Sequence, residues 1–139
     1  MGLILDTSSL VTAERRGHTV SEILERVQSA FGETAVGLSA VTIVELTHGI
    51  QRARIAVQRQ RRQLLVQELR AAVRVYPLTD EIAELAGMIS GQEADRGITL
   101  PFADLLIGAT ALHLGFEVLT ENVRHFQMIP NLAVRNLQA

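Results

Sequence analysis

The stretch LILDTSS, residues 3–9, decides how the whole chain is interpreted. Three consecutive apolar residues end at Asp6 and are followed by one threonine and two serines. This pattern is typical of a buried strand that leads into the capped start of a helix. It predicts that Asp6 lies at the carboxyl end of a strand, at the edge of a sheet.

Similar apolar runs recur along the chain and alternate with helical patterns. Short strands are predicted at residues 35–38, 73–76 and 117–120. Helices are predicted over about 40–50, 79–96 and 101–115, with an amphipathic helix or helical hairpin over 52–72. The helix that follows Pro101 is expected to turn Phe102 toward the core with Leu105 and Leu106. Short strands that alternate with helices predict an α/β fold with a mainly parallel central sheet flanked by helices.

Composition limits the classes of protein that fit. A length of 139 residues with 47% hydrophobic residues predicts a single domain, residues 1–139. No apolar stretch approaches the roughly 20 residues of a membrane helix, so we expect a cytoplasmic protein. Cysteine is absent, which excludes disulfides and thiolate zinc sites, and all 13 basic residues are arginine, which excludes lysine-dependent chemistry. With a net charge of −2, nucleic acid binding would require a local basic patch.

Three acids stand in places where acids are unusual. Asp6 follows a buried strand, whereas Glu45 and Asp104 lie inside apolar helical segments, VTIVEL and FADLLI. An unpaired carboxylate in such a position is costly. Each acid has an ordinary explanation, because Asp6 can cap a helix and any of the three can pair with an arginine. Together the three acids indicate that one common source of positive charge offsets this cost.

A divalent cation would provide that compensation. Two carboxylates about 5 Å apart repel by roughly 3 kcal/mol at an effective dielectric constant near 20. Ligands that are all oxygen favour Mg²⁺, with Mn²⁺ as a plausible substitute, over zinc. Short paired spacings typical of zinc ligands are absent among the histidines, which are His18, His48, His113 and His125.

Four segments, LILDTSSL, TIVEL, PFADLLIGATAL and VLTENVRHF, together resemble the PIN-domain ribonucleases. The resemblance extends from Leu3 to about Phe126 and is greatest to the VapC toxins of bacterial VapBC toxin-antitoxin pairs. It implies a PIN-like fold and a Mg²⁺-dependent endoribonuclease that hydrolyses RNA phosphodiester bonds. It also implies that Asp6, Glu45 and Asp104 hold one or two Mg²⁺ ions. We hypothesise that Asp6 and Asp104 bind the metal directly, while Glu45 binds through water or positions the nucleophile.

The family often has a fourth acid after the last strand, and this chain departs from that pattern. Asn122 and His125 occupy the two customary positions, with Glu121 beside them. We expect Asn122 to be a catalytic residue that orients water or phosphate. The hydroxyls of Thr7, Ser8 and Thr120 are candidate substrate contacts.

A basic segment and two partners complete the expected site. Arginines cluster between residues 52 and 62, and Arg61 and Arg62 are candidate phosphate contacts for a structured transfer or ribosomal RNA. A solvated helix face explains the same cluster. The resemblance implies a VapB-type antitoxin as partner and a homodimer.

Three other classes of protein share some of these sequence features. A housekeeping PIN nuclease in RNA processing would share the fold and the chemistry. A catalytically silent PIN-like module that binds RNA or protein would explain the altered fourth position. A receiver-type or haloacid-type phosphoryl enzyme also has an aspartate after its first strand, but this chain lacks the lysine that those families use.

Overall fold

The sheet of this computed structural model confirms the predicted α/β class. The structure describes residues 1–137, and within them the strands form one parallel sheet in the order β3-β2-β1-β4-β5. The strands are β1 (Gly2–Leu5), β2 (Ala35–Ser39), β3 (Arg74–Tyr76), β4 (Glu117–Leu119) and β5 (Val134–Arg135). Because β5 has only two residues, it carries no alternating pattern, and the sequence did not predict it.

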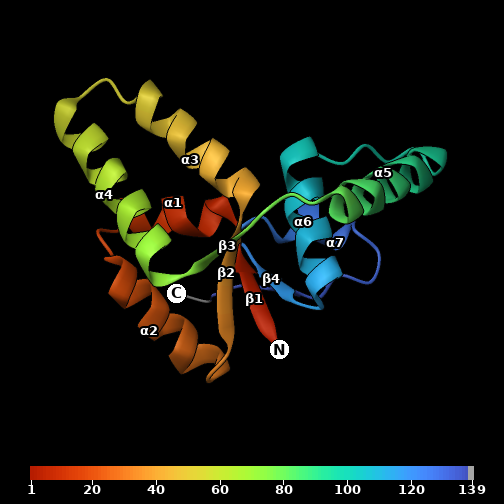
Figure 1. The fold of residues 1–139 in the computed structure, drawn as a ribbon, viewed down its shortest axis with the longest axis horizontal. Helices are drawn as coiled ribbons and strands as arrows, with labels where there is room; N and C mark the ends of the chain where they lie inside the picture. Colours follow the sequence, from red (N-terminus) through yellow and green to blue (C-terminus); the bar gives the residue numbers. More distant parts are fainter. Residues whose placement is uncertain (138–139) are drawn as a thin grey trace.

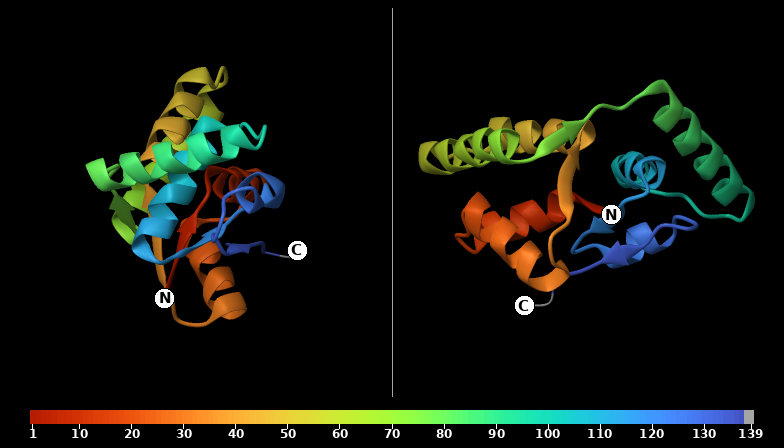
Figure 2. Two further views of the ribbon diagram at one scale, coloured as in Figure 1. Left: turned by 90° about the vertical axis from the view of Figure 1, so that its right-hand side faces the viewer. Right: turned by 60° about the horizontal axis from the view of Figure 1, so that its bottom comes forward.

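Helices cover both faces of the sheet. They are α1 (Thr7–Arg15), α2 (Val20–Phe31), α3 (Ala40–Arg52), α4 (Ala56–Ala72), α5 (Asp80–Asp95), α6 (Phe102–Leu114) and α7 (Val123–Gln127). Figure 1 shows α1 to α4 on one side of the strands and α5 to α7 on the other. The turned views in Figure 2 show the same separation, with α5 lying outside α6 rather than on the sheet.

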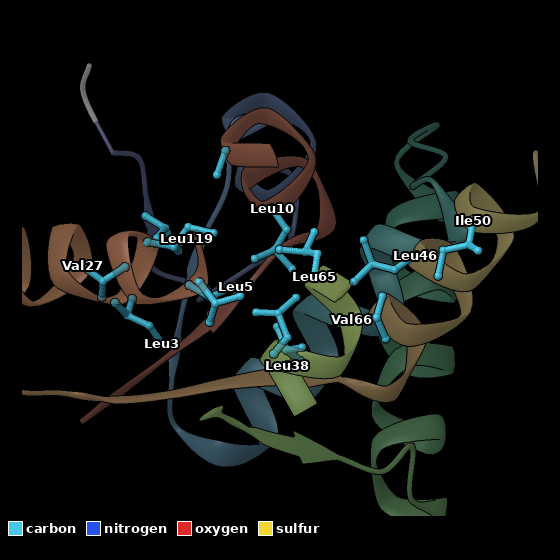
Figure 3. Packing of buried hydrophobic residues seen from close by; sticks show 14 residues of the cluster. Leu3, Leu5, Leu10, Val27, Leu38, Leu46, Ile50, Leu65, Val66 and Leu119 are labelled. Carbon is cyan, nitrogen blue, oxygen red and sulfur yellow. The ribbon is translucent and has the colours of Figure 1, made fainter. Parts of the chain in front are cut away.

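The alternation of side chains along β1 divides the core into two parts. Leu3 and Leu5 point into the core beneath α1 to α4, where Leu10 and Leu65 meet them (Figure 3). Ile4, between them, points into the opposite core. Successive side chains of a strand point to opposite faces, so a strand buried on both faces is a continuous apolar run.

The segment 52–72, predicted as an amphipathic helix or a helical hairpin, is a single helix, α4, which forms a helical hairpin with the separately predicted α3. The turn of this hairpin is held by two arginine side chains that donate to carbonyls near the end of α3. Arg59 Nη2 lies 2.8 Å from the oxygen of Ala53, and Arg62 Nη1 lies 2.7 Å from the oxygen of Gly49. The last carbonyls of a helix lack partners within the helix, so these contacts stabilise its end.

One expectation from the sequence is wrong, and one clear helix signal was missed. Phe102 is 74% exposed, because it is the first residue of α6 and the buried run of that helix begins only at Leu105. Helix α2 was not predicted, although Thr19 and Glu22 form a capping box at its start. That T-x-x-E pattern was the available signal.

Within residues 1–137, no helix is both long enough and apolar enough to cross a bilayer.

Candidate active site

Asp6 lies where β1 ends and α1 begins. Its side chain is almost fully buried, at 2% exposure, and makes no capping hydrogen bond to α1. Instead, Oδ2 accepts hydrogen bonds from the hydroxyls of Ser8, at 2.7 Å, and Thr120, at 2.8 Å. The helix-cap explanation for Asp6 therefore does not hold. Thr120 follows β4, the neighbour of β1, so the parallel sheet brings these groups together.

Glu45 lies on α3, which begins directly after β2. Its Oε1 accepts a hydrogen bond of 2.5 Å from the hydroxyl of Thr7, and that hydroxyl also lies 3.3 Å from the buried Thr42. Partial burial raises the pKa of Glu45, and the nearby charges of Asp6 and Asp104 raise it further, against the lowering effect of the Thr7 hydrogen bond. Glu45 therefore lies close enough to Asp6 and Asp104 for their charges to change its pKa.

Asp104 lies in the first turn of α6. Its Oδ2 lies 2.9 Å from Nδ1 of His125, which reaches it from α7. Partial burial raises the pKa of Asp104, and repulsion from Asp6 adds to this, whereas the hydrogen bond and charge of His125 lower the pKa. The three acids predicted from sequence thus come from separate elements and interact electrostatically.

No arginine neutralises these acids within residues 1–137. The ion pairs in this part of the chain are Arg96 with Glu93, Arg135 with Glu117, and His125 with Asp104. The arginine explanation for the three acids therefore does not hold. Their charges remain uncompensated apart from the imidazole of His125.

The acids match a divalent cation by their chemistry. All are oxygen donors and repel one another, as expected for ligands of Mg²⁺ or Mn²⁺. In residues 1–137, however, no three acidic, histidine or cysteine side chains are close enough to hold a metal as they stand. Direct ligation would require side-chain rotation or bridging water, and Mg²⁺ commonly keeps several waters.

The other predicted site residues have different surroundings. The hydroxyls of Thr7, Ser8 and Thr120 donate to the acids, so they position these carboxylates. Asn122 is exposed; its backbone N–H donates to Thr120 Oγ1 at 2.8 Å, and its side chain does not cap α7. Within the described residues, no hydrogen bond joins the Asn122 side chain to an acid of the site.

Sequence reasoning missed two further contacts at this edge. It did not single out Thr42 as a partner of Thr7, or Asn136, whose amide donates to the carbonyl oxygen of Thr120 at 2.9 Å. Both contacts join residues that are far apart in the chain, so no local pattern indicated them.

Arg61 and Arg62 differ in their surroundings. Arg61 is exposed, whereas the partly buried Arg62 is tied to Gly49 and lines a hollow of about 200 Å³ between α1, α3 and α4. Glu45 also lines this hollow, and its apolar walls are formed by Val11, Leu46, Leu65 and Val66. An apolar hollow therefore adjoins the acidic site.

These features define a parallel α/β fold with an acidic site at the carboxyl edge of its sheet. Residues 3–131 match the PIN domain family, and the chain belongs to that family.

Among individual proteins, the chain is similar to Ribonuclease VapC1 of Rickettsia felis, with 29% identity over 96% of this chain and 95% of that protein. It is 31% identical to Ribonuclease VapC10 of Mycobacterium tuberculosis, over 94% of this chain and 90% of that protein. Both relatives are named ribonucleases, which supports nuclease activity for this chain.

Solved structures agree on the fold. A chain in the crystal structure of VapBC2 from Rickettsia felis, bound to a promoter DNA fragment, superposes with a TM-score of 0.84 at 18% identity. That match covers 99% of this chain and 100% of the other. A chain of VapBC-1 from nontypeable Haemophilus influenzae gives a TM-score of 0.79 at 26% identity, covering 99% and 98%.

Proposed function

We propose that this protein is a Mg²⁺-dependent endoribonuclease and the toxin of a VapBC-type toxin-antitoxin pair. The observation that supports this most is the group of three acids, Asp6, Glu45 and Asp104. They come from separate parts of the fold. The charge of Asp6 raises the pKa of both Glu45 and Asp104, and no arginine pairs with any of the three acids in the described chain. The names of the VapC relatives support the choice of RNA as substrate.

In this proposal Asp6 and Asp104 bind the cation directly, and Glu45 binds it through water or orients the attacking water. Mn²⁺ can substitute for Mg²⁺. A bound cation of this kind neutralises phosphate charge and lowers the pKa of water. Ser8 and Thr120 hold Asp6, and Thr7 holds Glu45, so the chain fixes carboxylates that would otherwise move apart. Asn122 remains a candidate for contact with water or phosphate.

The activity can be tested on a mixed pool of transfer and ribosomal RNA. We expect purified protein to cut this pool at discrete positions in Mg²⁺ or Mn²⁺, and EDTA to stop the cutting. Mapping the cleaved ends identifies the target RNA. If folded protein cuts nothing with either metal, the proposal fails for these RNAs and a silent PIN-like binding module becomes the better account.

The difference between Arg61 and Arg62 leads to a prediction about RNA binding. Arg61→Ala should reduce the slope of log affinity against log salt by about 1, because one phosphate contact is lost. Arg62→Ala should leave that slope unchanged but lower the free energy of unfolding by about 1 kcal/mol, because Arg62 holds the end of α3. Filter binding over a salt series and urea denaturation measure both. Equal slopes for Arg61→Ala and wild type would remove Arg61 from the RNA interface.

The hollow beside Glu45 supports an antitoxin partner. Its apolar walls and its Arg62, Glu14 and Glu45 side chains suit a segment that combines apolar and charged residues. We propose that such a segment of a VapB-type antitoxin fills it and covers the acids. Addition of a VapB-type antitoxin that binds this protein should then suppress RNA cleavage. Normal cleavage in a formed complex would contradict this.

Exposed hydrophobic side chains support the proposed homodimer. Val44 is 68% exposed, Met88 54% and Phe102 74%, on α3, α5 and α6. Burial of such side chains between two copies of the chain would favour association. Light scattering should give twice the monomer mass, and Phe102→Asp should reduce it. A monomeric wild-type protein would exclude the dimer.

A further inference from the structure

His125 is the basic side chain that contacts the acidic site within residues 1–137. Its Nδ1 lies 2.9 Å from Oδ2 of Asp104, and its side chain is 48% exposed. An ionised carboxylate can only accept hydrogen bonds, so the imidazole Nδ1–H donates and Asp104 accepts. The other oxygen, Oδ1, makes no hydrogen bond with the described residues. One oxygen of Asp104 is thus fixed, and the other is available.

The backbone at His125 is anchored to the rest of the fold. The next residue, Phe126, is fully buried and belongs to the core that also contains Ile107 of α6. The backbone N–H of His125 itself bonds to the carbonyl oxygen of Asn122 at 3.2 Å. These contacts fix the backbone from which the half-exposed imidazole reaches Asp104.

Each acid of the site has a donor of its own. Hydroxyl groups hold Asp6 and Glu45, but in residues 1–137 the only side-chain donor to Asp104 is His125. A fourth carboxylate at this position would repel Asp104, whereas an imidazole attracts it. Partners that orient a metal ligand commonly act in this way.

We propose that His125 is a positioning residue for Asp104, which holds one oxygen of this carboxylate so that the other oxygen can bind a cation. In the proposed function Asp6 and Asp104 bind this cation directly, so the orientation of Asp104 by His125 contributes to the affinity for it. This inference rests on the proposed metal-dependent function.

Titration of the full-length protein with Mn²⁺ by calorimetry tests this role. His125→Leu should weaken Mn²⁺ binding by about 10- to 100-fold, the usual effect of losing a partner that orients a ligand. His125→Asn should restore most of the loss, because its amide nitrogen can take the place of Nδ1. His113→Leu removes an exposed imidazole from α6 and should bind Mn²⁺ like the wild type. RNA affinity in EDTA should be the same in all four proteins.

The outcomes separate this role from the proposed function. If wild type binds Mn²⁺ and His125→Leu binds it equally well, the positioning role is wrong and the proposed function stands. The role is also wrong if His125→Asn is as weak as His125→Leu. Failure of the wild type to bind Mn²⁺ would overturn both.

Discussion

Asp104→Asn is expected to lower the rate of RNA cleavage by about 1000-fold, because a metal ion contributes several kcal/mol of transition-state stabilisation. The asparagine keeps the shape of the side chain and an oxygen that can accept from His125, but it loses the charge that binds the cation. Folding should therefore be retained. Single-turnover cleavage of a mapped RNA substrate gives the rate, and circular dichroism checks the fold.

Asp80→Asn provides a matched control for this variant. Asp80 also lies in the first turn of a helix, α5, but it is exposed and lies outside the acidic site. Its replacement should leave cleavage within about 2-fold of wild type, since surface substitutions away from a site have small effects. Full activity in Asp104→Asn, or equal losses in both variants, would remove Asp104 from the catalytic site.

A second large effect is expected in the stability of the metal-free protein. The folded chain raises the pKa of Glu45 and of Asp104, so it binds protons more tightly than the unfolded chain does. The stability that protonation provides is therefore present at low pH and is lost as the pH rises through the raised pKa values. At neutral pH, metal-free Glu45→Gln should be more stable than the metal-free wild type.

With metal bound, the wild type should instead be more stable than Glu45→Gln. A cation at 100 times its dissociation constant stabilises a folded protein by about 2.7 kcal/mol. In a chain of this size this corresponds to roughly 5–10 °C in Tm. Thermal melts with EDTA and with Mg²⁺, at several pH values, measure both effects. Glu25→Gln removes an exposed acid of α2 and should follow the wild type throughout. A Glu45→Gln variant that gains as much from Mg²⁺ as the wild type would contradict the role of Glu45.

The sequence predicted the positions of the acids because each one breaks a strong local pattern. Asp6 ends an apolar strand, and Glu45 and Asp104 interrupt apolar stretches of helix, so their cost is visible without a structure. The parallel sheet could also be predicted, because strands buried on both faces are short continuous apolar runs between helices. Both features can be recognised from residues that are adjacent in the sequence.

The partners of the acids could not be predicted in the same way. Thr7 and Glu45 are 38 residues apart, Asp6 and Thr120 are 114 apart, and His125 reaches Asp104 from another helix. Such contacts depend on the register of β1 with β4 and on the packing of α7 against α6. Phe102 shows the same limit, because its exposure depends on where α6 begins to pack rather than on its helical spacing.

The proposed function requires that Asp6, Glu45 and Asp104 act together in cation binding. Mn²⁺ titration monitored by electron paramagnetic resonance tests it most directly, with wild type compared with Asp6→Asn, Glu45→Gln and Asp104→Asn. We predict saturable binding by the wild type and a loss of affinity of at least about 10-fold in each variant, since even partners of metal ligands contribute this much. Wild-type affinity in all three variants would contradict the claim, as would an absence of Mn²⁺ binding by the folded wild-type protein.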